Sequence, residues 1–236
     1  MILRAYLPQI LTALFGGLII AASIFTFGNA LVFDRLFLGV ILFTAILCRQ
    51  DVNVLSVIAI IFLQHIIEEF AWLYLPSSYL IKVFVYTIAF WLVYYFWYDW
   101  TSKILMLCGF LGVSTEVYWF VTEYDTPQTF WYVCIIMICI SMRHLVFLRV
   151  NFVENYISKK AKSINLDWVL YKINAVIIIT QTTVLFEYYL RHILGFQNAI
   201  FAYESLPYII HALSTLLIWS TFNESYKQLF PQVIKA

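Results

Sequence analysis

Eight runs of mostly apolar residues constrain this sequence more than any other feature. A helix needs about 20 such residues to cross the hydrocarbon core of a lipid bilayer, and each run is close to that length. Short breaks that contain Gly, Pro, Asp, Arg or Lys separate most of the runs. The expected spans are residues 7–27, 30–48, 52–75, 79–98, 104–121, 129–148, 168–190 and 206–222.

Composition also places this chain in a membrane. Of its 236 residues, 64% are hydrophobic and only 11% are charged, whereas a soluble domain carries about 25% charged residues. The net charge of +1 gives no reason to expect nucleic acid as a partner. We therefore predict an all-α, polytopic membrane helix bundle that forms one domain over residues 1–236, with the lipid bilayer as its surroundings.

The distribution of Lys and Arg predicts the orientation. If the N-terminus is cytoplasmic, eleven of the fourteen basic residues fall on the cytoplasmic side, and only Arg35, Lys82 and Arg191 fall outside. Membrane proteins show this excess of positive charge on the cytoplasmic side. Eight spans then place both termini in the cytoplasm, and we expect a multi-pass protein of a bacterial-type inner (plasma) membrane.

Five ionisable residues inside the predicted spans indicate a polar site. His65, Glu68 and Glu69 belong to the third span, Glu116 to the fifth and His211 to the eighth. At 1.5 Å per residue they lie about 3–9 Å from the span midpoints, all toward the outer side. A charged group at the centre of a membrane helix costs about 2.5–3.5 kcal/mol, so such residues normally face the bundle interior or a wet cavity.

Further polar residues extend this set toward the outer surface. Each of these residues also has a simple structural explanation. For example, Glu187 and Arg191 have opposite charges and are four positions apart on a helix, so they can neutralise one another. As candidates for a pathway or for support of the site we take Thr183, Glu187 and Arg191 on the seventh span, and Ser214 and Thr215 on the eighth.

Two functions would use the ionisable residues directly. In a metal-dependent membrane enzyme acting on a lipid-like substrate, His65, Glu69 and His211 would bind zinc or iron, and Glu68 or Glu116 would act as the base. A b-type haem would instead need His65 and His211 as facing ligands. The alternative is a proton- or cation-coupled transporter or channel that uses the same residues as relay groups.

A third function is a non-catalytic membrane subunit or a membrane-disrupting effector. Its polar faces would join helices within a homo-oligomer or bind another membrane protein. The basic connection 149–167, predicted to be cytoplasmic, would contact a partner or anionic lipid headgroups.

Arg143 is expected to reach the membrane surface as an anchor. The four cysteines form no CxxC pair and are predicted to be buried free thiols.

Overall fold

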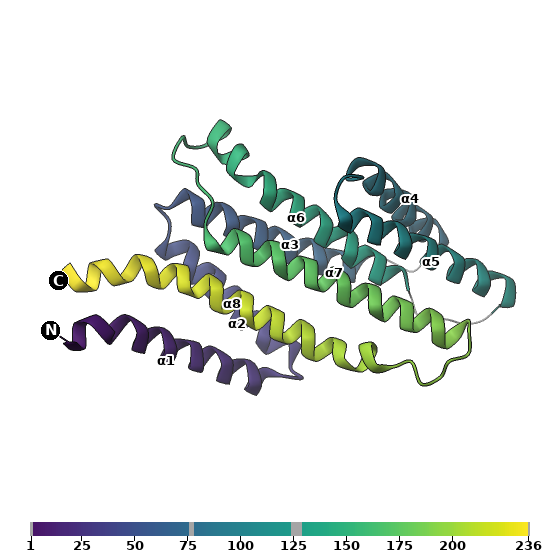
Figure 1. Cartoon of the computed structure of the whole chain (residues 1–236), viewed down its shortest axis with the longest axis horizontal. Coiled ribbons are helices and arrows are strands. Elements are labelled where there is room, and N and C mark those ends of the chain that lie inside the picture. Colours follow the sequence, from purple (N-terminus) through teal and green to yellow (C-terminus); the bar gives the residue numbers. More distant parts are fainter. Residues whose placement is uncertain (1, 76–77, 124–128, 236) are drawn as a thin grey trace. The chain divides into compact units, whose positions relative to one another are not determined.

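The computed structural model describes residues 2–75, 78–123 and 129–235, without the side chains of residues 2–12, 225–226 and 228–235. This part of the chain is built from α-helices and their connections (Figure 1), as the sequence predicts. From the N-terminus the eight helices are α1 (Ile2–Thr26), α2 (Ala30–Leu47), α3 (Val52–Tyr74), α4 (Tyr79–Tyr95), α5 (Trp100–Thr122), α6 (Phe130–Tyr156), α7 (Asn165–His192) and α8 (Phe201–Lys235).

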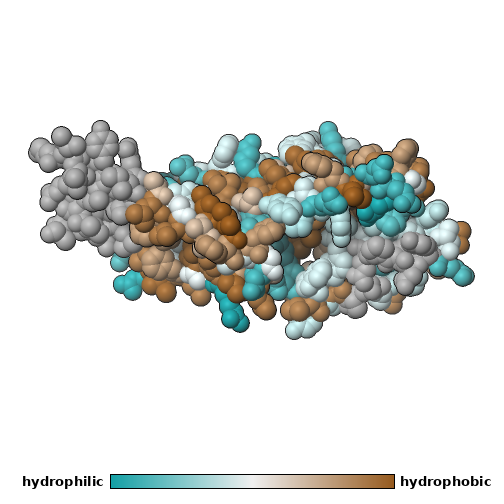
Figure 2. Space-filling view, turned by 90° about the horizontal axis from the view of Figure 1, so that it is seen from below, coloured by the Kyte–Doolittle hydropathy of each residue, from teal (hydrophilic) through white to brown (hydrophobic). Residues whose placement is uncertain are grey.

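Among the described residues, six helices are long and apolar enough to cross a membrane. They are α2, α3, α5, α6, α7 and the segment Phe201–Glu224 of α8. The apolar helix α4 has 17 residues, and within α1 the described side chains form the apolar segment Ala13–Thr26. Hydrophobic side chains cover much of the face drawn in Figure 2. The all-α class is thus confirmed, whereas the eight-span topology with cytoplasmic termini stays a prediction.

Local sequence explains several helix ends. Gly28 follows α1 with a φ of 85°, a left-handed conformation that costs glycine little. Asn29 precedes α2, and its side-chain oxygen accepts a hydrogen bond from the backbone N–H of Val32. Asp99 caps α5 in the same way, through the N–H of Thr101. These side chains satisfy N–H groups that have no partner within the helix.

The described chain divides into two compact units. Unit 1 comprises residues 1–62, 146–170 and 208–236, and unit 2 comprises residues 63–145 and 171–207. In unit 1, α1 packs near α2. In unit 2, α4 and α5 lie side by side (Figure 1).

The connection between α6 and α7 is shorter than the predicted stretch 149–167. Helix α6 continues to Tyr156 and α7 begins at Asn165, so both Arg149 and Asp167 are helical. The prediction of a loop at these positions is wrong because their charges are paired. Arg149 and Asp167 are 3% and 6% exposed and form an ion pair inside unit 1.

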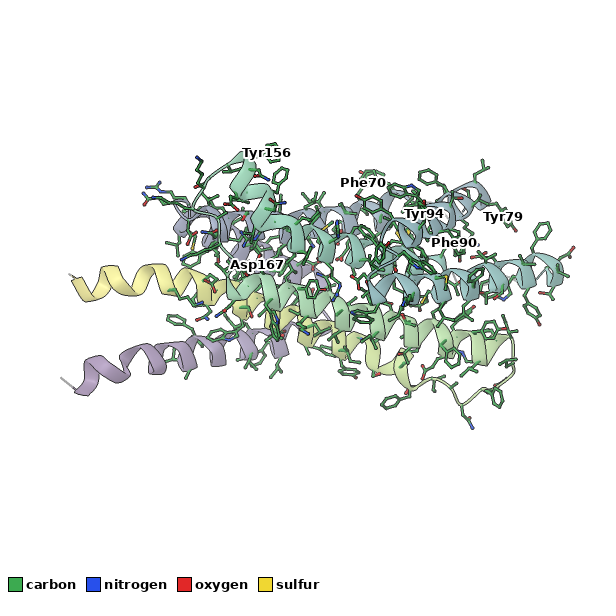
Figure 3. The ribbon with its side chains drawn as sticks, turned by 45° about the horizontal axis from the view of Figure 1, so that its top comes forward. Phe70, Tyr79, Phe90, Tyr94, Tyr156 and Asp167 are labelled. Carbon is green, nitrogen blue, oxygen red and sulfur yellow. The ribbon has the colours of Figure 1, made fainter. Side chains whose placement is uncertain are left out.

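A buried arginine clamp fixes this connection within unit 1. The Arg149 guanidinium donates two hydrogen bonds of 2.5 Å to the carboxylate of Asp167, which is labelled in Figure 3. It also donates to Oγ of Ser56 at 2.9 Å and to the carbonyl oxygens of Lys162 and Asn53 at 2.8 and 3.4 Å. Arginine suits this position because its planar fork of donors matches a carboxylate.

Candidate functional site

A hydrogen-bonded chain of three polar side chains joins α3 to α7 inside unit 2. Gln64 Nε2 donates to Glu68 Oε1 at 2.9 Å and to Asn174 Oδ1 at 3.0 Å. Asn174 Nδ2 returns a hydrogen bond to Gln64 Oε1 at 3.3 Å. Gln64 and Glu68 share a face of α3 because they are four residues apart. Asn174 is fully buried, so the network lies inside the unit.

Of these three residues only Glu68 is predicted from the sequence as a site residue. Gln64 and Asn174 carry no charge, so a search for ionisable groups passes over them. The signal that could have found them is an amide side chain within an apolar run, since a buried amide needs a hydrogen-bond partner.

The other two ionisable residues of α3 occupy a neighbouring stripe of the helix. His65 is half-buried and Glu69 is exposed. Each follows a network residue by one position, and successive positions on a helix are about 100° apart. His65 and Glu69 therefore point away from the face that carries Gln64 and Glu68.

Glu116 lies elsewhere in unit 2, in an ion pair between α4 and α5. Its Oε2 lies 2.7 Å from Nζ of Lys82, and both side chains are about 15% exposed. In the sequence Lys82 serves only as a topology marker, and its pairing with Glu116 is not predicted. The position of Lys82 in the first turn of a predicted span was the signal that could have indicated a charged partner.

His211 belongs to unit 1 and is bound by α1. Its Nε2 lies 2.8 Å from both Oγ and the carbonyl oxygen of Ser23. Oγ of Ser23 also contacts Oγ1 of Thr215, and Thr215 donates to the His211 carbonyl at 2.7 Å. The ring of Phe33 lies 4.3 Å from the imidazole, centre to centre. The neighbouring Ser214 is half-buried.

The predicted metal and haem sites gain no support from these positions. In the described part of the chain, no group of three His, Cys, Asp or Glu residues lies close enough together to hold a metal ion. His65 belongs to unit 2 and His211 to unit 1, so a site that joins them stays a prediction.

The candidate pathway residues of α7 have structural partners. The carboxylate of Glu187 accepts hydrogen bonds from the backbone N–H groups of Ala202 and Tyr203, at 2.8 and 3.0 Å. It thereby caps the start of α8, where an anion is favourable. Arg191 lies 5.6 Å from the ring of Tyr203. Thr183 is exposed, and its hydroxyl bonds a carbonyl of its own helix.

The buried face of α7 carries two amides instead. Asn174 and Gln181 are 0% and 4% exposed, and they are seven residues apart, so they share one face. The side-chain oxygen Oε1 of Gln181 is buried and has no hydrogen-bond partner in the described part of unit 2. A buried acceptor without a partner is costly, which distinguishes this position from the paired amide of Asn174.

Arg143 lies at one end of this buried face. Its guanidinium is 3.8 Å from the ring centre of Tyr171 and donates to the Tyr171 carbonyl at 3.1 Å. Asp99 lies 3.8 Å away as a weak ionic partner. The side chain is 1% exposed, so the expectation of a surface anchor is wrong. The aromatic ring and the carboxylate make burial of the charge less costly.

These helices and their exposed apolar side chains define a multi-pass helical membrane protein. Comparisons with protein-family models, with curated proteins and with solved structures found no match.

Proposed function

We propose that the protein carries protons across the membrane through unit 2, with Glu68 as the proton-binding group. The observation that supports this proposal is the network of Gln64, Glu68 and Asn174. The hydrogen-bond partner of Glu68 in this network is a neutral amide. A carboxyl group held in this way can gain or release a proton without breaking an ion pair. Carboxyl groups inside membrane helices serve as relay sites in pumps and transporters.

The alignment of buried polar groups along α7 provides the proposed route. Asn174 and Gln181 lie about 10 Å apart along the helix axis, at 1.5 Å per residue. The unpartnered oxygen of Gln181 offers an acceptor beyond the Glu68 network. The buried Arg143 lies on the other side of Asn174, beside Tyr171. In the orientation we propose, with both termini in the cytoplasm of a bacterial plasma membrane, Arg143 marks the cytoplasmic end.

Other ionisable residues are less suitable as proton-binding groups because other groups already bind them. Glu116 is neutralised by Lys82, and Glu187 is occupied by the start of α8. His211 is bound to Ser23 in unit 1. A metal-dependent enzyme would need several ligands at one place, and the described residues offer no such group. Glu68 therefore becomes the residue on which the proposal rests.

A second candidate function is that of a membrane subunit in which the network only holds helices together. Amide side chains commonly join membrane helices, with about 0.6 kcal/mol per hydrogen bond on average. The reciprocal pair of Gln64 and Asn174 is the observation that favours this alternative.

Proton flux into proteoliposomes distinguishes the two functions. The purified chain is reconstituted with an entrapped pH-sensitive dye, and a potassium gradient with valinomycin drives the protons. In Glu68→Gln the side-chain oxygen still accepts a hydrogen bond from Gln64, but the group no longer carries a proton. We expect its flux to fall to that of protein-free liposomes while its thermal stability stays close to wild type.

Glu69→Gln is the matched control, because it makes the same change one position further along α3 on an exposed side chain. We expect its flux to equal that of the wild type. Wild-type flux no greater than that of empty liposomes, or full flux in Glu68→Gln, would overturn the proposal. A loss of thermal stability in Glu68→Gln without any wild-type flux would favour the subunit function.

A further inference from the structure

A groove with a volume of about 390 Å³ runs between α4 and α5 in unit 2. Its apolar walls include Val83 and Phe90 of α4 and Val113 and Val117 of α5. Val83 and Val117 are 64% and 57% exposed, so the groove is open along its side.

The groove has the length of one leaflet of a bilayer. Tyr79 and Phe90, both labelled in Figure 3, line it and are eleven residues apart on α4. At 1.5 Å per residue this separation is about 16 Å. The hydrocarbon core of a membrane is about 30 Å thick, so one leaflet is about 15 Å deep.

The charged part of the groove lies near the ends of both helices. Lys82 is in the first turn of α4, and Glu116 is six residues before the end of α5. Both residues line the groove, with 2.7 Å between Nζ and Oε2. The ring of Tyr79 lies 5.8 Å from the ammonium group. Tyr79 and Phe120 lie beyond this pair toward the helix ends, and from the pair toward the helix middles the groove is lined by Tyr86, Val113 and Phe90. The groove therefore joins one charged part to an apolar part, as a lipid molecule does.

We propose that this groove binds one zwitterionic phospholipid, such as phosphatidylethanolamine. Its phosphate would contact Lys82, its amine would contact Glu116, and one acyl chain would lie along Val83, Val113 and Phe90. The ion pair presents a positive and a negative group side by side with no net charge. A phosphoethanolamine headgroup has the complementary pair of charges. An anionic headgroup without an amine would face the Glu116 carboxylate with no compensating charge.

The ion pair has an alternative role, which is only to hold α4 against α5. In that case any lipid would fill the groove, and the headgroup would make no difference. A measurement of headgroup preference therefore separates a lipid site from a structural ion pair.

The experiment is a titration of the detergent-purified full chain with phosphatidylethanolamine or phosphatidylglycerol, followed by native mass spectrometry of the bound lipid. We expect the wild type to bind phosphatidylethanolamine at least about tenfold more tightly than phosphatidylglycerol, a difference in binding free energy of about 1.4 kcal/mol. Val117→Trp fills the groove beside the ion pair and should abolish this preference. Leu107→Trp makes the same change on the same helix at a residue that is 52% exposed and outside the groove, and it should behave as wild type.

Glu116→Gln supplies a directional test. It leaves Lys82 as an uncompensated cation, so the preference should shift toward phosphatidylglycerol. Equal binding of the two lipids by the wild type would overturn the proposal. Preference for phosphatidylethanolamine in Val117→Trp would overturn it as well, and this variant remains informative if Glu116→Gln fails to fold.

Discussion

Replacing Arg149 by leucine should destabilise the protein more than most single substitutions. The guanidinium contributes two hydrogen bonds to Asp167, one to Ser56 Oγ and two to backbone carbonyls. The Asp167 carboxylate is 6% exposed, and without the guanidinium it keeps the N–H of Ile164 as a donor. Removing one member of a buried ion pair costs about 3–5 kcal/mol. At about 2–4 °C per kcal/mol for a chain of this size, the midpoint should fall by about 6–20 °C.

The four cysteines of the chain supply the assay. All four are free and buried, so heating in the presence of a thiol-reactive fluorescent dye reports unfolding. Arg149→Lys keeps the charge but loses the bidentate geometry, and it should fall between the leucine variant and wild type. The double variant with leucine at both Arg149 and Asp167 should recover much of the loss, because a well-packed apolar pair can replace a buried ion pair.

Lys159→Leu is the control for this prediction. It removes one positive charge from an exposed position in the same connection, and we expect a change within about 0.5 kcal/mol. If Arg149→Leu melts at the same temperature as Lys159→Leu, the clamp does not stabilise the fold and the reasoning fails.

Three further predictions use other contacts. A methyl group at Gly112 would lie 2.6 Å from the Tyr86 hydroxyl, so Gly112→Ala should lower the free energy of unfolding by about 1–3 kcal/mol. Gly39 has open space around it, so Gly39→Ala should leave the melting temperature unchanged or raise it. Glu187→Ala removes the cap of α8 and should cost about 0.5–2 kcal/mol, with faster hydrogen exchange in its first turn. Burial and, next, nearby carboxylates raise the pKa of the Cys48 thiol to about 11. Cys48 should therefore resist alkylation at pH 8 until the protein unfolds, and its contribution to stability should fall as the pH rises above about 8.5, the pKa of an unfolded cysteine.

The helices could be predicted from sequence because the requirement for an apolar run is local. Each of the eight predicted spans overlaps a helix of the structure. The prediction failed at the connection 149–167, where charged residues suggested a loop. Arg149 and Asp167 neutralise each other inside unit 1, and a pattern of single residues does not record pairing.

The candidate site was only partly predictable. Glu68 was found because a carboxyl group in an apolar run is conspicuous. Gln64 and Asn174 were missed because neutral amides resemble ordinary polar positions until their partner is known. Lys82 was interpreted as a topology marker, although its ammonium group is the partner of Glu116.

The sequence by itself determined that this is a helical membrane protein, because hydropathy adds up over neighbouring residues. Only the tertiary structure decided which helices the polar residues join, because the partners that cross between helices come from distant parts of the chain. Gln64 and Asn174 are 110 residues apart, and Lys82 and Glu116 are 34 apart. Glu68 accepts a hydrogen bond from the Gln64 amide, whereas Glu116 is paired with the Lys82 ammonium group.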